Sequence, residues 1–109
     1  MIVIKRNGTE VDFDITKIIA AITKANDSVE ESARMTPMQI RRIADFVELQ
    51  CLKMNRAPSV EEIQDLVEYQ IMAHGAFEVA KSYITYRYTR SLVRKSNTTD
   101  EKILSLIEC

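Results

Sequence analysis

The chain opens with Ile2-Val3-Ile4-Lys5-Arg6-Asn7-Gly8-Thr9-Glu10-Val11-Asp12-Phe13, a stretch that decides how everything after it must pack. Asn7-Gly8 separates two β-rich runs and predicts a two-residue type I′ turn, because both residues tolerate positive φ. This loop would place Lys5 opposite Glu10. The predicted apolar face then carries Ile2, Ile4, Val11 and Phe13, and the other face carries Val3, Lys5, Glu10 and Asp12. A lone hairpin is marginal in water, so the apolar face must dock on helices.

Four helical patterns follow the hairpin. The first runs from an N-cap at Asp14 to about Ala25. The second and third open with capping boxes, at Thr36 and Ser59, and the third ends at His74-Gly75. The fourth covers about 76–95, and the segment 26–35 is predicted to be a loop. Helical spacing predicts these inward side chains: Ile15, Ile18, Ile19, Ile22, Ile40, Ile43, Ala44, Val47, Cys51, Ile63, Leu66, Val67, Ile71, Phe77, Ala80, Tyr83 and Ile84.

These elements predict an α+β, mostly helical domain in which the N-terminal β-hairpin caps a four-helix bundle. We expect the domain over residues 1–95, and over 96–109 a polar linker with a short amphipathic segment that begins a further domain. The 109 residues suit one domain, and two glycines are too few for a turn-rich β fold.

Composition and motifs exclude several functions. The formal net charge of −1 indicates neither nucleic acid nor an acidic membrane as partner, and no apolar run reaches membrane-spanning length. The two cysteines, Cys51 and Cys109, lack metal-site spacing, and their unpaired state with no signal peptide indicates a cytoplasmic protein. His74 is expected to cap carbonyls at a helix end. No catalytic constellation or glycine-rich phosphate loop is present, so we expect no enzymatic activity from this chain alone.

Cations gather where the hairpin meets the first helix. Lys17 lies in the first helical turn, where the helix dipole disfavours positive charge, and Lys5 and Arg6 lie at the hairpin tip. A bound polyphosphate would relieve their repulsion. The alternative is that these are solvated surface charges, with Lys5 paired to Glu10 across the strands.

A second basic stripe lies on the fourth helix. Arg87, Arg90 and Arg94 recur at helical spacing, with Tyr83 one turn earlier on the same face. Arginines bind phosphate oxygens, so the stripe fits either a nucleotide or a nucleic-acid backbone. The alternative is a solvated helix end, where arginines are favoured.

These residues resemble those of a known family. The runs 3–8 and 13–18, then 59–68 and 80–87, follow the order and spacing of the ATP-cone. The resemblance implies a regulatory domain that binds ATP or dATP, with Mg²⁺, between the hairpin and the bundle. It implies these nucleotide contacts: Val3, Ile4, Lys5, Arg6, Lys17, Val60, Gln64, Arg87 and Arg90. Some family members carry an acid at position 11. With Val11 on the predicted apolar face, we expect no recognition role there.

The tail, residues 90–109, resembles the join between cone and catalytic barrel in anaerobic, class III ribonucleoside-triphosphate reductases. The resemblance implies allosteric control of that enzyme's overall activity, and partners that are adenine nucleotides, other copies of the domain or the parent catalytic domain. Two alternatives remain. One is the cone of the ribonucleotide reductase repressor, which would need a zinc ribbon before the hairpin. The other is a nucleic-acid or protein interaction module built on the arginine stripe.

Overall fold

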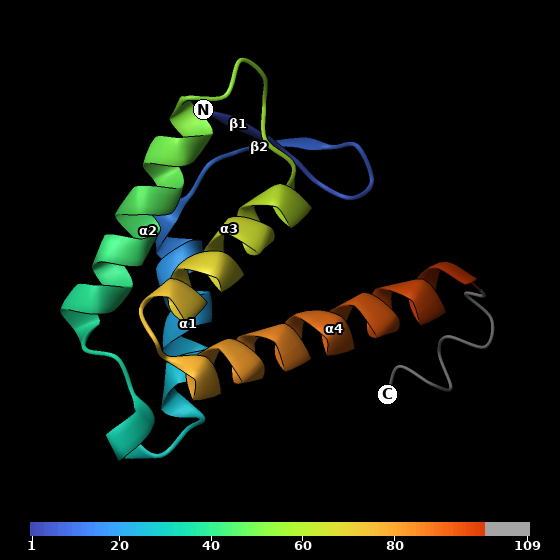
Figure 1. The fold of residues 1–109 in the computed structure, drawn as a ribbon. Coiled ribbons are helices and arrows are strands. Elements are labelled where there is room, and N and C mark those ends of the chain that lie inside the picture. The colour runs from blue at the N-terminus through green and yellow to red at the C-terminus, as the bar shows by residue number, and fades with distance from the viewer. Residues whose placement is uncertain (100–109) are drawn as a thin grey trace.

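A computed structural model describes residues 1–99, except that the side chains of Ser91 and of residues 94–99 are not described. The chain forms the strands β1 (Ile2–Ile4) and β2 (Glu10–Asp12), followed by four α-helices. The helices are α1 (Ile15–Asp27), α2 (Pro37–Leu52), α3 (Val60–Ala73) and α4 (Phe77–Thr99), with a short 3₁₀ helix, η1 (Glu31–Ala33), between α1 and α2. The predicted fold class is confirmed (Figure 1).

The helices begin at the residues that their capping signals predict. Asp14 caps α1, and the side chains of Thr36 and Ser59 complete capping boxes with Gln39 and Glu62. Each box satisfies backbone N–H groups that have no partner inside the helix. After α3, Gly75 adopts the left-handed conformation, with φ of 77°, and the His74 ring lies 2.9 Å from the Gln70 carbonyl oxygen. Both predictions for this turn are confirmed.

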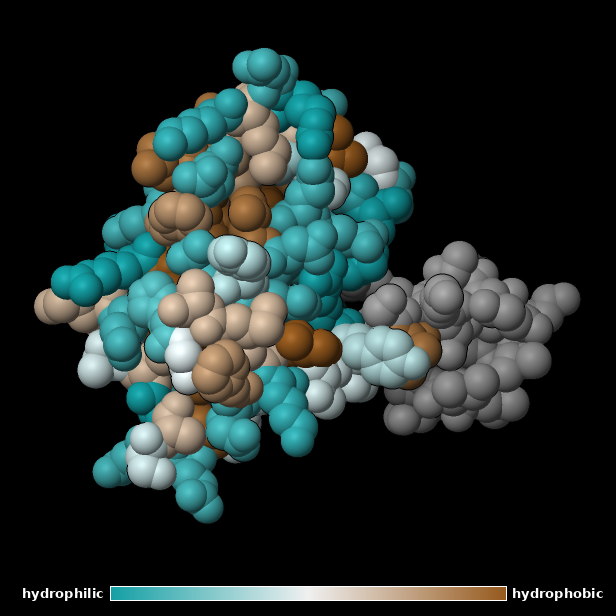
Figure 2. All heavy atoms as spheres, in the orientation of Figure 1, coloured by the Kyte–Doolittle hydropathy of each residue, from teal (hydrophilic) through white to brown (hydrophobic). Residues whose placement is uncertain are grey.

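The four helices pack in a ring. α1 contacts α2 and α4, and α3 contacts the same two helices from the other side. The core between them contains Ile22, Ile43, Val47, Val67, Ile71 and Val79, each almost fully buried. The face of the molecule in Figure 2 is mostly hydrophilic, with some hydrophobic side chains exposed among the hydrophilic ones.

The hairpin attaches beside the start of α3. The Ile4 N–H donates to the Pro58 carbonyl at 2.9 Å, and Ile4 pairs in parallel with Ser59. The strands therefore lie across the N-terminal end of α3 (Figure 1). This attachment places one face of the hairpin over α1 and α3.

The predicted hairpin register is wrong by one residue. Val3 lies opposite Val11, and Ile4 lies opposite Glu10. The Gly8 N–H donates to the Lys5 carbonyl at 2.9 Å. Within this turn only Gly8 has a positive φ, of 85°. The turn is therefore a three-residue loop with one left-handed glycine, not a type I′ turn. Because strand faces alternate, this slip puts Val3 on the inner face beside Val11, and Ile2 and Ile4 on the outer one.

The prediction for the fourth helix also needs correction. Phe77 and Ile84 were expected to face inward, but they are 68% and 40% exposed, and Val79 is buried instead. The inward stripe is Val79, Ala80 and Tyr83. The helix runs on to Thr99, past the end expected near residue 95, so 96–99 are helical. Residues 100–109, including Cys109 and the expected amphipathic segment, lie outside the described part of the chain.

The segment 26–35 is more structured than the predicted loop. Asn26 is buried, and its side-chain amide bonds the backbone of Met35 at both ends, at 3.1 Å to the carbonyl and 2.8 Å from the N–H. Met35 is itself buried in the core. These two hydrogen bonds fix the connection between α1 and α2. Both polar atoms of the buried Asn26 side chain therefore have a partner.

Candidate functional site: a lysine-rimmed pocket under the hairpin

A pocket of about 290 Å³ lies between the inner face of the hairpin and the helices. Its lining comes from both strands, from α1, α3 and α4: Val3, Lys5, Val11, Asp12, Phe13, Asp14, Lys17, Ile18, Ala21, Val60, Ile63, Gln64, Val67 and Tyr83. Its volume is at the lower end of the range for small-molecule sites, enough for a nucleoside-sized group with the rest of a ligand outside.

The closed end of the pocket is apolar. Val3, Val67 and Tyr83 are 4%, 1% and 5% exposed, and Ile63 is also buried. These side chains come from β1, α3 and α4, so only the folded bundle brings them together. A surface of this kind suits a flat, uncharged ring, which would replace water against it.

The mouth of the pocket is charged. Lys5 enters from the hairpin and Lys17 from the first turn of α1, and both are exposed. Neither lysine forms an ion pair with any residue of the described chain. The predicted alternative, Lys5 paired with Glu10, is therefore not observed, because Glu10 lies opposite Ile4. Two unpaired ammonium groups at one mouth can bind an anionic group.

Two carboxylates share the mouth with the lysines. Asp14 caps α1, and its pKa is lowered, chiefly by the side-chain hydrogen bond from Thr16 and also by the charge of Lys17. Asp12, the last residue of β2, lies nearby. The mouth thus offers two cationic groups and two carboxylates. A bare anion would meet both signs of charge, whereas an anion accompanied by a divalent cation would find a partner for each.

Arg6 does not line the pocket. Its guanidinium lies 3.2 Å from the Glu61 carboxylate and donates to the Gln64 amide oxygen at 3.3 Å. These contacts hold the hairpin tip against α3, and Gln64 itself lines the pocket.

Arg87 lies against α3 and not at the pocket. Its guanidinium donates to Glu68 at 2.7 Å, to Asp65 at 2.8 Å and to the Glu61 carbonyl at 3.3 Å. Burial works against the charged form, but the two carboxylates outweigh it and raise the pKa of Arg87. Arg87 is therefore already paired, and this removes one member of the arginine stripe that predicted a nucleic-acid or protein surface.

The remaining predicted nucleotide contacts also include residues that line the pocket and residues that do not. Val60 and Gln64 line the pocket, as Val3, Lys5 and Lys17 do. Ile4 is on the outer face of the hairpin, and Arg90 is exposed on α4 outside the pocket lining. The Arg94 side chain is not among those that the structure describes. Five of the predicted residues thus share one pocket, while Ile4, Arg6, Arg87 and Arg90 do not line it.

Val11 lies on the face of the hairpin that packs towards the helices, as predicted, and it lines the pocket there. That Val11 has no recognition role stays a prediction. Ile63 and Val67 were predicted only as inward-facing residues, and Tyr83 also as a member of the stripe on the fourth helix; all three line the pocket. Their helical periodicity indicated burial, but periodicity within one helix carries no information about which cavity a side chain meets.

The other hollows and the potential metal-binding side chains of the described residues are weaker candidates for a functional site. A hollow of about 550 Å³ is lined by Ala20, Thr23, Lys24, Asp27 and Ser28, all on one stretch of α1 and its cap, and it has no buried floor. Among the described residues, no group of three or more His, Cys, Asp or Glu side chains is placed to hold a metal ion. No helix within residues 1–99 combines the length and apolarity needed to cross a membrane.

The fold defines the class of protein, a small helical domain capped by a β-hairpin, with a pocket between the hairpin and the helices. Residues 1–92 match the family described as the ATP cone domain, and the chain belongs to this family.

The curated relatives are ribonucleotide reductases of several kinds. The chain is 38% identical over 106 residues to the ribonucleoside-diphosphate reductase subunit alpha of Chlamydia trachomatis, covering 90% of this chain and 10% of the relative. It is 43% identical over 98 residues to the vitamin B12-dependent ribonucleoside-diphosphate reductase of Thermoplasma acidophilum, covering 85% and 12%. It is 35% identical over 108 residues to the anaerobic ribonucleoside-triphosphate reductase of Haemophilus influenzae, covering 97% and 15%. The chain thus spans only a small part of each relative's length.

Proposed function

We propose that the domain binds an adenine nucleoside triphosphate, ATP or dATP, in the pocket under the hairpin. The observation that carries this proposal is the pairing of an apolar, buried floor with two unpaired lysines at the mouth. A nucleoside triphosphate has a matching division, with a flat uncharged base at one end and a polyanion at the other. The lysines at the exposed mouth would hold the phosphates through charge-assisted hydrogen bonds.

Mg²⁺ fits the same mouth. Magnesium in proteins usually keeps several waters and binds one or two carboxylates together with substrate phosphates. Asp12 and Asp14 line the pocket beside the two lysines. We propose that they lie close enough to the phosphate end to attract the metal, which would offset their repulsion of the nucleotide.

We propose that binding is an allosteric signal, read by a parent ribonucleotide reductase and controlling its overall activity. ATP and dATP differ by one hydroxyl, so the signal must come from a difference in the conformations or assemblies that they favour. The partners would be other copies of the domain or the catalytic domain. This chain would contribute regulation and no catalysis, in a cytoplasmic enzyme.

Within the reductases, we propose the anaerobic ribonucleoside-triphosphate kind. The support is the resemblance of residues 90–109 to the join with its catalytic barrel, and the Haemophilus influenzae relative that covers 97% of the chain. The diphosphate reductases match as well, so the catalytic domain of the parent enzyme is the test. A glycyl-radical barrel there would support the anaerobic enzyme, and a diphosphate reductase barrel would refute it.

Calorimetry tests nucleotide binding directly. We expect the chain to bind ATP and dATP more tightly than GTP or UTP. Lys5→Ala and Lys17→Ala should each weaken ATP and dATP together by about 10-fold or more, because each removes a charge-assisted contact of roughly 1.5–3 kcal/mol.

Lys53→Ala is the matched control, since Lys53 is exposed at the end of α2 and lines no part of the pocket. It should leave the affinity unchanged. A wild-type chain with no preference for adenine, or lysine variants that bind like the wild type, would contradict the proposal.

A further inference from the structure

Tyr83 has a buried hydroxyl without a protein partner. The side chain is 5% exposed, at the closed end of the pocket, where it lies with Val3, Ile63 and Val67. Its hydroxyl forms no hydrogen bond with any residue that the structure describes. Buried tyrosine hydroxyls are usually paired, because an unmade hydrogen bond leaves the group desolvated without compensation.

The neighbouring ion pairs do not use this hydroxyl. Arg87, one turn further along α4, gives its hydrogen bonds to Asp65, Glu68 and the Glu61 carbonyl. Burial raises the pKa of Tyr83 to about 12, so the hydroxyl keeps its proton at neutral pH. A neutral phenol can donate one hydrogen bond and accept others, which is what the edge of a heterocycle requires.

Tyr83 and the charged lining residues of the pocket differ in their exposure. The buried members of the lining are on the floor, and Lys5, Lys17, Asp12 and Asp14 are exposed at the mouth. A ligand whose anionic end lies with the lysines would therefore present its opposite, uncharged end to Tyr83.

We propose that the Tyr83 hydroxyl is the specificity-determining contact for the edge of the nucleobase, at the floor of the pocket. This inference rests on the proposed function and names the part of the ligand that Tyr83 would read. The apolar side chains around it give the base a surface to pack on, while the hydroxyl supplies the polar partner that its edge atoms need. A base without edge atoms to pair with this hydroxyl would leave it unsatisfied and bind less well.

The test is Tyr83→Phe, which removes one oxygen and keeps the buried ring. The probes are ATP and inorganic tripolyphosphate, each measured with the whole 109-residue chain by displacement of a fluorescent adenine nucleotide. We expect ATP affinity to fall by about three- to tenfold, the usual effect of one neutral hydrogen bond, and tripolyphosphate affinity to stay unchanged. The melting temperature without ligand should stay the same or rise, because the variant loses an unpaired buried hydroxyl.

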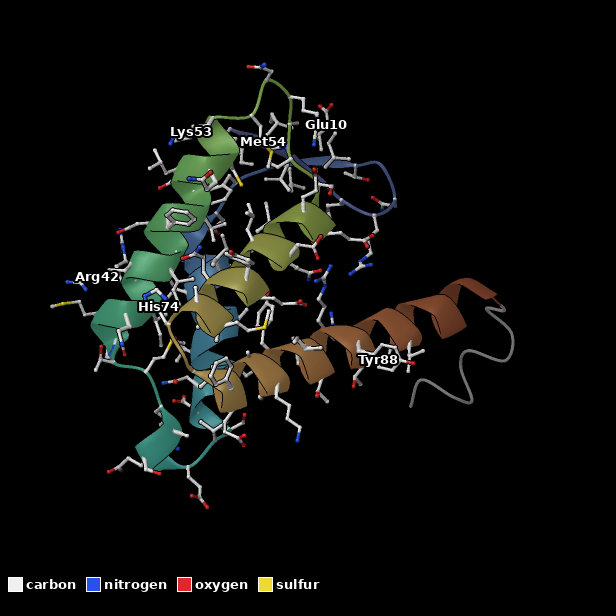
Figure 3. All side chains as sticks on the ribbon, viewed as in Figure 1. Glu10, Arg42, Lys53, Met54, His74 and Tyr88 are labelled. Carbon is white, nitrogen blue, oxygen red and sulfur yellow. The ribbon has the colours of Figure 1, made fainter. Side chains whose placement is uncertain are left out.

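Tyr88→Phe is the matched control, since Tyr88 is 64% exposed on the part of α4 that projects beyond the other helices, and it does not line the pocket (Figure 3). It should bind both probes like the wild type. Equal ATP affinity in Tyr83→Phe and wild type would overturn the inference, and so would an equal loss for ATP and tripolyphosphate, which would indicate a general change in the fold. If wild type itself binds no ATP, the proposed function fails, whatever Tyr83 does.

Discussion

Replacing Arg87 with methionine should destabilise the domain rather than only weaken its ligand. The side chains of Arg87 and Glu68 are 18% and 19% exposed, whereas the side chain of Asp65 is 69% exposed. An exposed pair contributes about 0–1 kcal/mol, and breaking a fully buried pair costs about 3–5 kcal/mol. The Arg87–Glu68 pair is mostly but not fully buried, so the cost of breaking it lies between these limits. We therefore expect a loss of about 2 kcal/mol, since methionine keeps the apolar stem but leaves Glu68 without its partner.

Urea unfolding followed by circular dichroism measures this loss. For a domain of this size, about 2 kcal/mol lowers the melting temperature by about 8–16 °C. Arg90→Met is the matched control, because Arg90 is exposed one turn further on and has no ion pair with a described residue. It should change the free energy of unfolding by less than about 0.5 kcal/mol.

A second variant separates the two readings of Arg87. Adding Glu68→Gln to Arg87→Met should restore part of the stability, because it removes the unpaired carboxylate. If Arg87→Met unfolds like the wild type but no longer binds nucleotide, the ion-pair reasoning is refuted. Arg87 would then serve the ligand, as its position on the helix first predicted.

Two further predictions concern the hairpin turn and the cap of α3. Gly8→Ala should cost about 1–2 kcal/mol of unfolding free energy, because Gly8 has φ of 85°; an unchanged urea midpoint would show that the turn is formed differently. The hydrogen bond from Arg56 is the main cause that lowers the pKa of Glu62 from 4.5 to about 2. Because the folded-state pKa is below the unfolded one, this contribution is complete above about pH 4.5 and is lost as pH falls towards 2. Glu62→Gln should flatten the decline of stability in that window, and a decline as steep as in the wild type would contradict the assignment.

Local sequence signals determined most of the fold. The ends of α2 and α3 follow from Thr36, Ser59 and Gly75, because capping and left-handed turns depend on residues only a few positions apart. The buried stripe of α2 followed from helical spacing for the same reason, and all of its predicted members are buried. Lys5 and Lys17, predicted to gather near the hairpin–helix junction, line one pocket because the hairpin folds β1 back beside β2, which leads into α1.

Only the tertiary structure decided the rest. Asn7-Gly8 permits more than one turn, and the turn that forms, with negative φ at Asn7, set the register and put Val3 on the inner face in place of Ile2 and Ile4. The partners of Arg87 and the neighbours of Tyr83 lie on other elements, so no pattern within α4 could identify them. The sequence by itself determined the helices, their caps and the cations near the hairpin. Packing decided which cations are free and which face of the hairpin closes the pocket, because both depend on contacts between segments far apart in the chain.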